Sequence, residues 1–203
     1  MTVTEPDHLL PTDEGYAAWR REFGDLAMVG LREQYRGLLG RKLDSLLFYC
    51  YPISETPDVV SNLGNRFLWL GGAIGVKFDD APLLLLTWKQ GRDNCNLVGI
   101  NDDASWLTVD RINASPEAPW DALFGATLLR VSFFTHGEVE GPIAVRHDFK
   151  GTTGLASLWV GVGYERDQRI CDADDLYAGL DAPPNVSELP LMEVMGDDLG
   201  QAP

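Results

Sequence analysis

The sequence predicts an α+β fold that is mainly antiparallel β-sheet, with an N-terminal helical segment and two similar helix-plus-sheet halves in one domain, residues 1–203. Three observations predict this fold. Short apolar runs recur about every ten residues between turn residues, which is typical of antiparallel sheets. Residues 12–28 instead have helical periodicity. Residues 35–48 are echoed by residues 120–133 at a constant offset of 85 residues, which indicates an internal repeat.

The helical segment begins after a polar arm, residues 1–11, that contains two prolines. The acidic residues that follow Thr12 suit the positive end of a helix dipole. One apolar stripe follows at steps of three and four, formed by Tyr16, Trp19, Phe23 and Leu26. A second short helix is expected over residues 32–39, and Gly40 suits the left-handed position that ends a helix.

The first half then changes to strand periodicity. We expect loops over residues 52–64 and 89–96 and a turn over residues 79–82. Gly71 and Gly72 lie between two strand-like runs and predict a tight hairpin. The expected strands are residues 43–50, 66–70, 73–78, 83–88, 97–100 and 106–109.

The second half opens with Ser115 as an N-cap and Pro116 at the first helical position. An apolar face at Trp120, Leu123 and Phe124 follows, and Gly125 ends the helix. Three strands are expected, over residues 128–135, 142–149 and 155–164. The order of elements matches the first half, so the halves are assigned to about 31–110 and 115–165. Residues 74–78 also resemble residues 145–149, at an offset of 71.

The C-terminal region, residues 170–203, is acidic and contains no lysine or arginine. Proline interrupts it, and its last residues, 196–203, are expected to be disordered. Apolar residues between 189 and 195 are suited to docking on the body or on a partner. The two simplest interpretations are therefore a solvated tail and a surface that complements a basic partner.

The formal net charge of −15 limits the classes of molecule that the protein is expected to bind. Nucleic acid is disfavoured because phosphate contacts need clustered lysine and arginine, and an anionic membrane surface is disfavoured for the same reason. A basic protein is the natural electrostatic complement. The N-terminus lacks the features of a secretory signal, and no apolar run reaches the length of a membrane span. Three widely spaced cysteines suggest reduced thiols, so a cytoplasmic location is expected.

The candidate for metal binding or acid–base chemistry is a group around a predicted hairpin. Alternate residues of a strand share a face, so some of these side chains can converge. The glycines at 137 and 141 favour a solvated loop instead, and the second histidine suits a semi-buried position with a local hydrogen bond. No catalytic residue, metal ligand or cofactor is therefore predicted. The residues in question are His136, Glu138, Glu140, His147 and Asp148.

In general character the chain resembles a bacterial immunity protein or antitoxin: it is small, acidic and rich in aromatic residues, without a catalytic motif. This resemblance covers the whole chain and implies tight one-to-one binding that neutralises a toxin. Acidic side chains would then steer association with a basic partner. The expected partner-binding residues are Asp172, Asp174, Asp175, Tyr177 and Glu188.

Two other functions stay open from the sequence. One is a small-ligand-binding β-rich domain whose cleft lies between the halves. The other is a hydrolase or metal enzyme that uses His136 and His147. The oligomeric state is also left open. The strands expected to line the cleft are those of Trp69, Trp88, Trp106 and Trp159.

Overall fold

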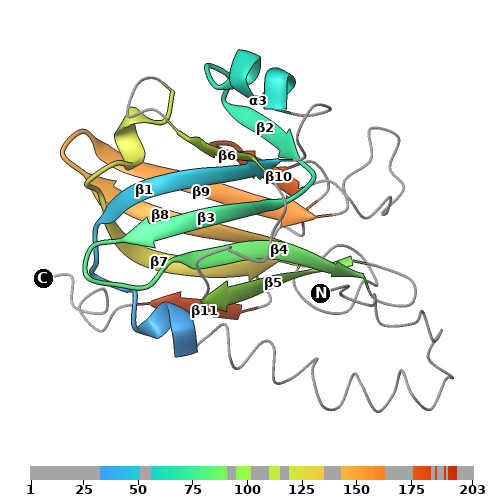
Figure 1. Cartoon of the computed structure of the whole chain (residues 1–203). Coiled ribbons are helices and arrows are strands. Elements are labelled where there is room, and N and C mark those ends of the chain that lie inside the picture. The colour runs from blue at the N-terminus through green and yellow to red at the C-terminus, as the bar shows by residue number, and fades with distance from the viewer. Residues whose placement is uncertain are drawn as a thin grey trace, which may run out of the picture.

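In a computed structural model the chain consists mainly of two antiparallel β-sheets (Figure 1). This agrees with the β-rich class predicted from the sequence. The residues that the structure describes are 33–50, 56–90, 95–101, 110–114, 119–134, 143–162, 176–183, 186, 190 and 192–195. The predicted helix over residues 12–28 lies outside them, as does the end of the acidic region, residues 196–203.

The first sheet has five strands in the order β5-β4-β3-β1-β6. Their bounds are β1 (Leu43–Cys50), β3 (Ala73–Phe78), β4 (Leu84–Gln90), β5 (Cys95–Asn101) and β6 (Asp110–Asn113). The second sheet has six strands in the order β11-β7-β8-β9-β10-β2. Their bounds are β2 (Phe67–Leu70), β7 (Thr127–Phe134), β8 (Ala144–Gly151), β9 (Gly154–Val162), β10 (Leu176–Gly179) and β11 (Met192–Met195).

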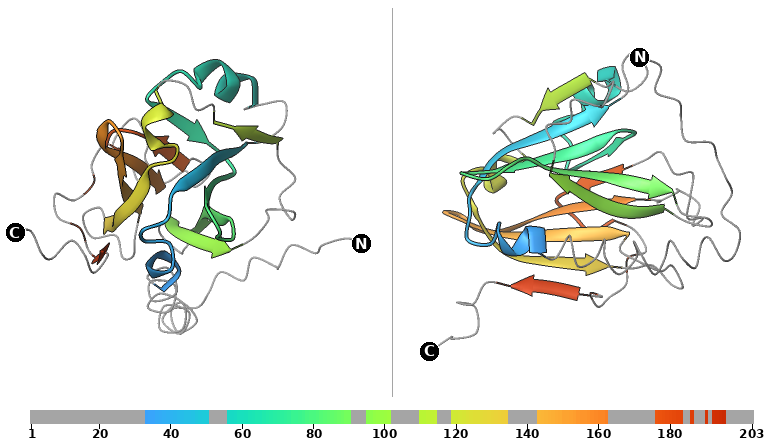
Figure 2. Two further views of the ribbon diagram at one scale, coloured as in Figure 1. Left: turned by 90° about the vertical axis from the view of Figure 1, so that its left-hand side faces the viewer. Right: turned by 60° about the horizontal axis from the view of Figure 1, so that its bottom comes forward.

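The two sheets form two layers with the hydrophobic core between them (Figure 2). Phe78 of β3 stacks on Phe149 of β8 with ring centroids 6.3 Å apart, so the layers are in direct contact. Trp120 packs edge-on against Phe48 and donates a hydrogen bond from Nε1 to the Leu63 carbonyl, at 2.8 Å. Inward-facing side chains alternate with outward-facing ones along each strand, so each sheet also has an outer face.

The starts of β1 and β7 meet at one corner. Lys42 and Thr127 form an isolated antiparallel bridge. Beside it, Gly40 N donates to Leu128 O at 2.9 Å and Gly125 N donates to Leu43 O at 2.8 Å. Gly40 has φ +81° and Gly125 has φ +71°, a region that glycine adopts without a steric penalty. The left-handed conformation expected at Gly40 is therefore confirmed.

The hairpin expected at Gly71 and Gly72 is wrong. The strands on either side form, but β2 pairs with β10 in the six-stranded sheet, whereas β3 pairs with β1 and β4 in the other. The two glycines therefore connect the sheets. A Cβ atom on Gly72 would lie 2.5 Å from the Tyr49 carbonyl oxygen, so the second glycine is needed for close approach of two backbones.

The loop expected over residues 52–64 is also partly wrong, because α3 (Thr56–Asn62) lies within it. Its sequence contains two start signals for a helix: a proline follows Thr56, and Asp58 lies in the first turn. Val59 is buried against the core, and the side chains of Ser61 and Asn62 donate hydrogen bonds to the Asp58 carbonyl.

Residues 115–118, where the helix of the second half is expected to begin, lie outside the described residues; in the described part of that segment there is a single 3-10 turn, η2 (Asp121–Leu123), whose N-cap position is Trp120. Residues 32–39 likewise contain one helical turn, at residues 33–36, among those that the structure describes. Strand β6 begins just beyond the strand expected over residues 106–109, which lie outside the described residues. Within the described ranges, no helix has the length and apolar character to cross a membrane.

Candidate functional site

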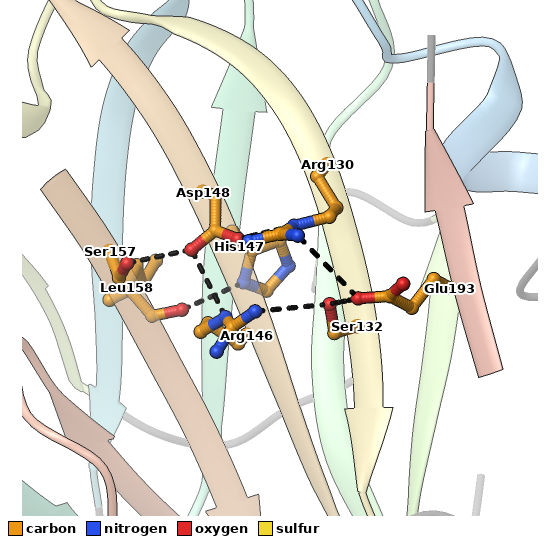
Figure 3. A network of polar contacts seen from close by, with 8 residues as sticks. All are labelled: Arg130, Ser132, Arg146, His147, Asp148, Ser157, Leu158 and Glu193. Carbon is orange, nitrogen blue, oxygen red and sulfur yellow. Dashed lines mark hydrogen bonds and ion pairs between the residues drawn. The ribbon is translucent and has the colours of Figure 1, made fainter. Parts of the chain in front are cut away.

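The largest polar network in the described part of the chain lies on the outer face of the six-stranded sheet (Figure 3). Strand register sets its position. Arg130 on β7 pairs with Asp148 on β8, which pairs with Ser157 on β9. One row further, Glu193 on β11 pairs with Ser132 on β7. Arg146 on β8 completes this second row beside Ser132. Four strands therefore bring these side chains together.

Asp148 is the centre of the network. Its carboxylate accepts hydrogen bonds from Arg130 Nε at 2.8 Å and from Ser157 Oγ at 2.7 Å. Arg146 Nε lies 3.1 Å from the same carboxylate, close enough for an ion pair although it is not aligned for a hydrogen bond. The Asp148 side chain is 14% exposed, so these contacts are partly shielded from water. Shielding strengthens charge-assisted contacts relative to those on an open surface.

The second row joins the last strand to the network. Ser132 Oγ donates a hydrogen bond to Glu193 Oε1 at 2.9 Å, and the same carboxylate oxygen lies 3.8 Å from Arg130 Nη1. Arg146 Nη2 lies 3.5 Å from Ser132 Oγ. Two arginines therefore face two carboxylates, and the charges of the network balance.

Arg146 is also held by aromatic rings. Its guanidinium carbon lies 5.5 Å from the centroid of Phe134 and 5.4 Å from that of Trp159. Both distances are within the range of cation–π attraction. The two rings are themselves in contact, with centroids 4.9 Å apart. The planar guanidinium is thereby fixed between aromatic and carboxylate partners, which a lysine cannot reproduce.

Tyr177, the one expected partner-binding residue that the structure describes, lies on the same outer face but is 4% exposed. Phe67 stacks on its ring at 5.9 Å and Trp69 contacts it edge-on at 5.4 Å. Its hydroxyl donates to the Asp181 carbonyl at 2.9 Å. Burial first, and then the Asp181 charge, raises the pKa of Tyr177 to about 12. The ring also covers Gly179, where an added Cβ would clash with the Tyr177 oxygen.

The Asp181 carboxylate itself forms a two-pronged pair with Arg66, with both N···O distances at 2.8 Å. This pair holds the pKa of the Asp181 carboxyl below its usual value and raises the pKa of Arg66. It joins the residue before β2 to the residues after β10. Both side chains are more than half exposed, so the pair contributes little to stability.

His147 is fully buried on the inner face of β8. Its Nδ1 lies 3.2 Å from the Leu158 carbonyl, which can only accept, so Nδ1 carries the proton. Nε2 then accepts a hydrogen bond from the Tyr35 hydroxyl at 2.6 Å. Burial lowers the pKa of His147 to about 4, against weaker opposing effects of the Leu158 hydrogen bond and the Asp148 charge. The sequence predicts a semi-buried histidine with a local hydrogen bond; in the structure His147 is completely buried.

The other expected site residues lie outside the part of the chain that the structure describes. They are His136, Glu138, Glu140, Asp172, Asp174, Asp175 and Glu188. Among the residues that the structure does describe, no group of three histidine, cysteine or acidic side chains is placed to hold a metal ion. The aspartates at 79 and 80 form a turn, as expected, with Asp79 Oδ1 accepting from Lys42 N at 2.8 Å.

The tryptophans expected in a cleft between the halves are placed differently. Trp69 and Trp159 lie on the outer face of the six-stranded sheet, since they share that face with Tyr177 and Arg146 by register. They therefore do not line the space between the layers. The side chains of Trp88 and Trp106 lie outside the described residues. Sequence reasoning missed the Arg130–Asp148 network, although the alternation of charged and apolar residues over 144–150 carries its signal.

Chemically, this network is suited to holding strands together. Its two hydroxyls, those of Ser132 and Ser157, each donate a hydrogen bond to a carboxylate of the network, and Ser132 is completely buried. Its two arginines already have carboxylate partners. Comparisons of the chain with models of protein families, with curated proteins and with solved structures find no match. The interpretation of the site therefore depends on its own geometry and charge.

Proposed function

We propose that the protein is a cytoplasmic binding module that neutralises a basic protein partner, in the manner of a bacterial immunity protein or antitoxin. One observation carries the proposal: the charge is segregated within the chain. The described residues contain ten acidic and ten basic side chains, so the net charge of −15 comes wholly from the other segments. A neutral double sheet thus bears strongly acidic segments.

This distribution suits electrostatic recognition. Long-range attraction between an acidic surface and a basic protein speeds association and disfavours wrong partners. It needs no catalytic group. Four of the expected partner-binding residues, Asp172, Asp174, Asp175 and Glu188, belong to the segments that carry the excess charge.

The test begins with a defined partner. A protein that co-purifies from the native cell and is encoded by the neighbouring reading frame is purified and titrated against this chain at about 0.05 M and about 0.5 M salt, which differ severalfold in screening length. Co-purification alone does not support the proposal. We expect a basic partner whose affinity falls at high salt. A partner that is acidic, or an affinity that salt does not change, overturns the proposal.

Charge-reversed variants sharpen the test. Asp172→Lys, Asp174→Lys and Asp175→Lys are combined in one variant. The matched control changes Asp44, Asp58 and Asp121 in the same way, so that both variants have the same net charge. The first variant is expected to lose affinity and salt dependence, and the control to lose much less. Equal losses refute the assignment to these residues.

We also propose that the two sheets are copies of one five-stranded unit. What supports this is their strand order: β5-β4-β3-β1-β6 and β10-β9-β8-β7-β11 correspond strand for strand, with β2 added at one edge. In this proposal the second unit extends through β10 and β11, beyond residue 165, and so includes strands from the acidic region.

Local geometry supports the same correspondence. The corner hydrogen bonds occur in pairs that a shift of 85 residues exchanges, such as Gly40 to Leu128 and Gly125 to Leu43. The pairing of β1 with β3 is irregular between Leu43 and Ser45. The pairing of β7 with β8 is irregular at the positions 85 residues later, between Leu128 and Arg130.

A further inference from the structure

We infer that the basic partner docks on the outer face of the six-stranded sheet, at a patch formed by Leu155, Met195, Arg130 and Asp148. This inference rests on the proposed function and names the surface that performs it. The patch is continuous by register: Met195 pairs with Arg130, Arg130 with Asp148, and Asp148 with Ser157, two residues along β9 from Leu155.

Most of the exposed large apolar side chains that the structure describes lie on this face, on strands β11, β9 and β2. Four large apolar side chains are exposed in the described part of the chain: Val60, Phe67, Leu155 and Met195. The last three share the outer face of the six-stranded sheet, and Leu155 is 78% exposed. Interfaces between proteins are enriched in methionine, arginine and aromatic residues, which this face combines.

The other sheet provides an internal comparison. Its outer face carries a closed apolar cluster in which Tyr49, Ala73 and Leu85 are buried. By strand order and register, Gly75 in β3 takes the position that Arg146 has in β8, and Leu47 takes that of Ser132. The two faces therefore differ at their centres. One has a buried apolar cluster there, with Arg111 and Asn113 exposed on the edge strand β6, and the other has a charged network, with Arg130 38% and Glu193 33% exposed.

The charge of the chain decides the occupant. A second copy would bring two net charges of −15 together, and this repulsion opposes self-association through a face whose own charges balance. A basic protein is attracted instead, because the acidic run of residues 172–175 precedes β10 and Glu188 precedes β11, two strands of this same sheet. Leu155 and Met195 then provide contact area, while the arginine–carboxylate network fixes orientation.

The test uses neutral substitutions so that the net charge is unchanged. Leu155→Asn and Met195→Asn are compared with the control Val60→Asn, which alters an exposed apolar residue on α3. Titration of the full-length variants with the purified basic partner is expected to show about a tenfold loss of affinity for each of the first two. The control should stay within about twofold, and the salt dependence should stay the same in all three. Unfolding midpoints verify that each variant folds.

The outcomes separate the two proposals. If Leu155→Asn binds the basic partner as tightly as Val60→Asn does, with affinity still sensitive to salt, the docking face is wrong and the proposed function stands. If no basic partner binds the unmodified chain, the proposed function itself fails. If sedimentation shows a dimer that Leu155→Asn dissociates, the occupant is a second copy and the inference is overturned.

Discussion

The buried pair of Tyr35 and His147 makes a prediction that can be worked through quantitatively. Both side chains are fully buried, and the Tyr35 hydroxyl donates to His147 Nε2 at 2.6 Å. Tyr35→Phe removes only the hydroxyl and leaves Nε2 without its donor in the core. An unsatisfied buried polar atom costs about 1–3 kcal/mol, so we expect a loss of that size in the free energy of unfolding at pH 7.

The pH dependence follows from the lowered pKa of His147. This pKa is about 4 in the folded protein, against 6.5 for a histidine in the unfolded chain, so the unfolded chain binds the proton more tightly. The neutral histidine therefore contributes fully to stability above pH 6.5, and this contribution is lost as the pH falls to about 4. Each unit of pKa difference corresponds to about 1.4 kcal/mol, so the total loss is about 3 kcal/mol.

The assay is urea unfolding at pH 7 and at pH 4.5 for the unmodified chain, Tyr35→Phe, His147→Leu and the double variant. Carboxylates titrate in all four proteins, so their effect cancels in the differences. When the pH falls from 7 to 4.5, the free energy of unfolding of His147→Leu should decrease by about 2–3 kcal/mol less than that of the unmodified chain. In the double variant both polar partners are absent, so its loss in free energy of unfolding should be smaller than the sum of the two single losses. Additive losses, or an unchanged pH difference in His147→Leu, would refute the reasoning.

Three further predictions concern the backbone and the network. Gly72→Ala should lower the free energy of unfolding by at least about 2 kcal/mol, because its Cβ meets the Tyr49 carbonyl; Gly64→Ala, with open space around it, is the neutral control in the same urea titration. Gly40→Ala and Gly125→Ala should each cost about 1–2 kcal/mol from positive φ alone, and clearly unequal thermal shifts would contradict their correspondence. Asp148→Asn should cost about 1.5–3 kcal/mol by chemical denaturation, since two arginines lose their shared carboxylate; no change would show that the network is not structural.

The strands were predictable where local pattern and tertiary role agree. The run over 43–50 has strand periodicity and a glycine break before it, and β1 occupies the predicted bounds. Gly40 was predictable for the same reason, because a helical turn that reverses direction needs a left-handed residue.

Pairing partners were not predictable. The two glycines before Ala73 satisfy the rules for a hairpin, yet long-range pairing of β2 with β10 decides where that strand lies. The alternation of residues predicts which face of the sheet each side chain lies on, but not which strand pairs with which. The Arg130–Asp148 network was missed because its charged side chains become neighbours only once the register of β7, β8 and β9 is known, and because Glu193 joins it from a strand 61 residues beyond Ser132.

The position of β2 has a consequence for how the chain can be divided. This strand precedes β3 in sequence but completes the edge of the opposite sheet, beside β10. A chain cut between β6 and η2 would leave the first fragment with a strand that has no partner of its own and the second with an open edge. The fragments are complementary rather than independent, because β2 of the first fragment pairs with β10 of the second. Reassembly from the two pieces, and a single cooperative unfolding transition in the intact chain, are the behaviour that this topology imposes.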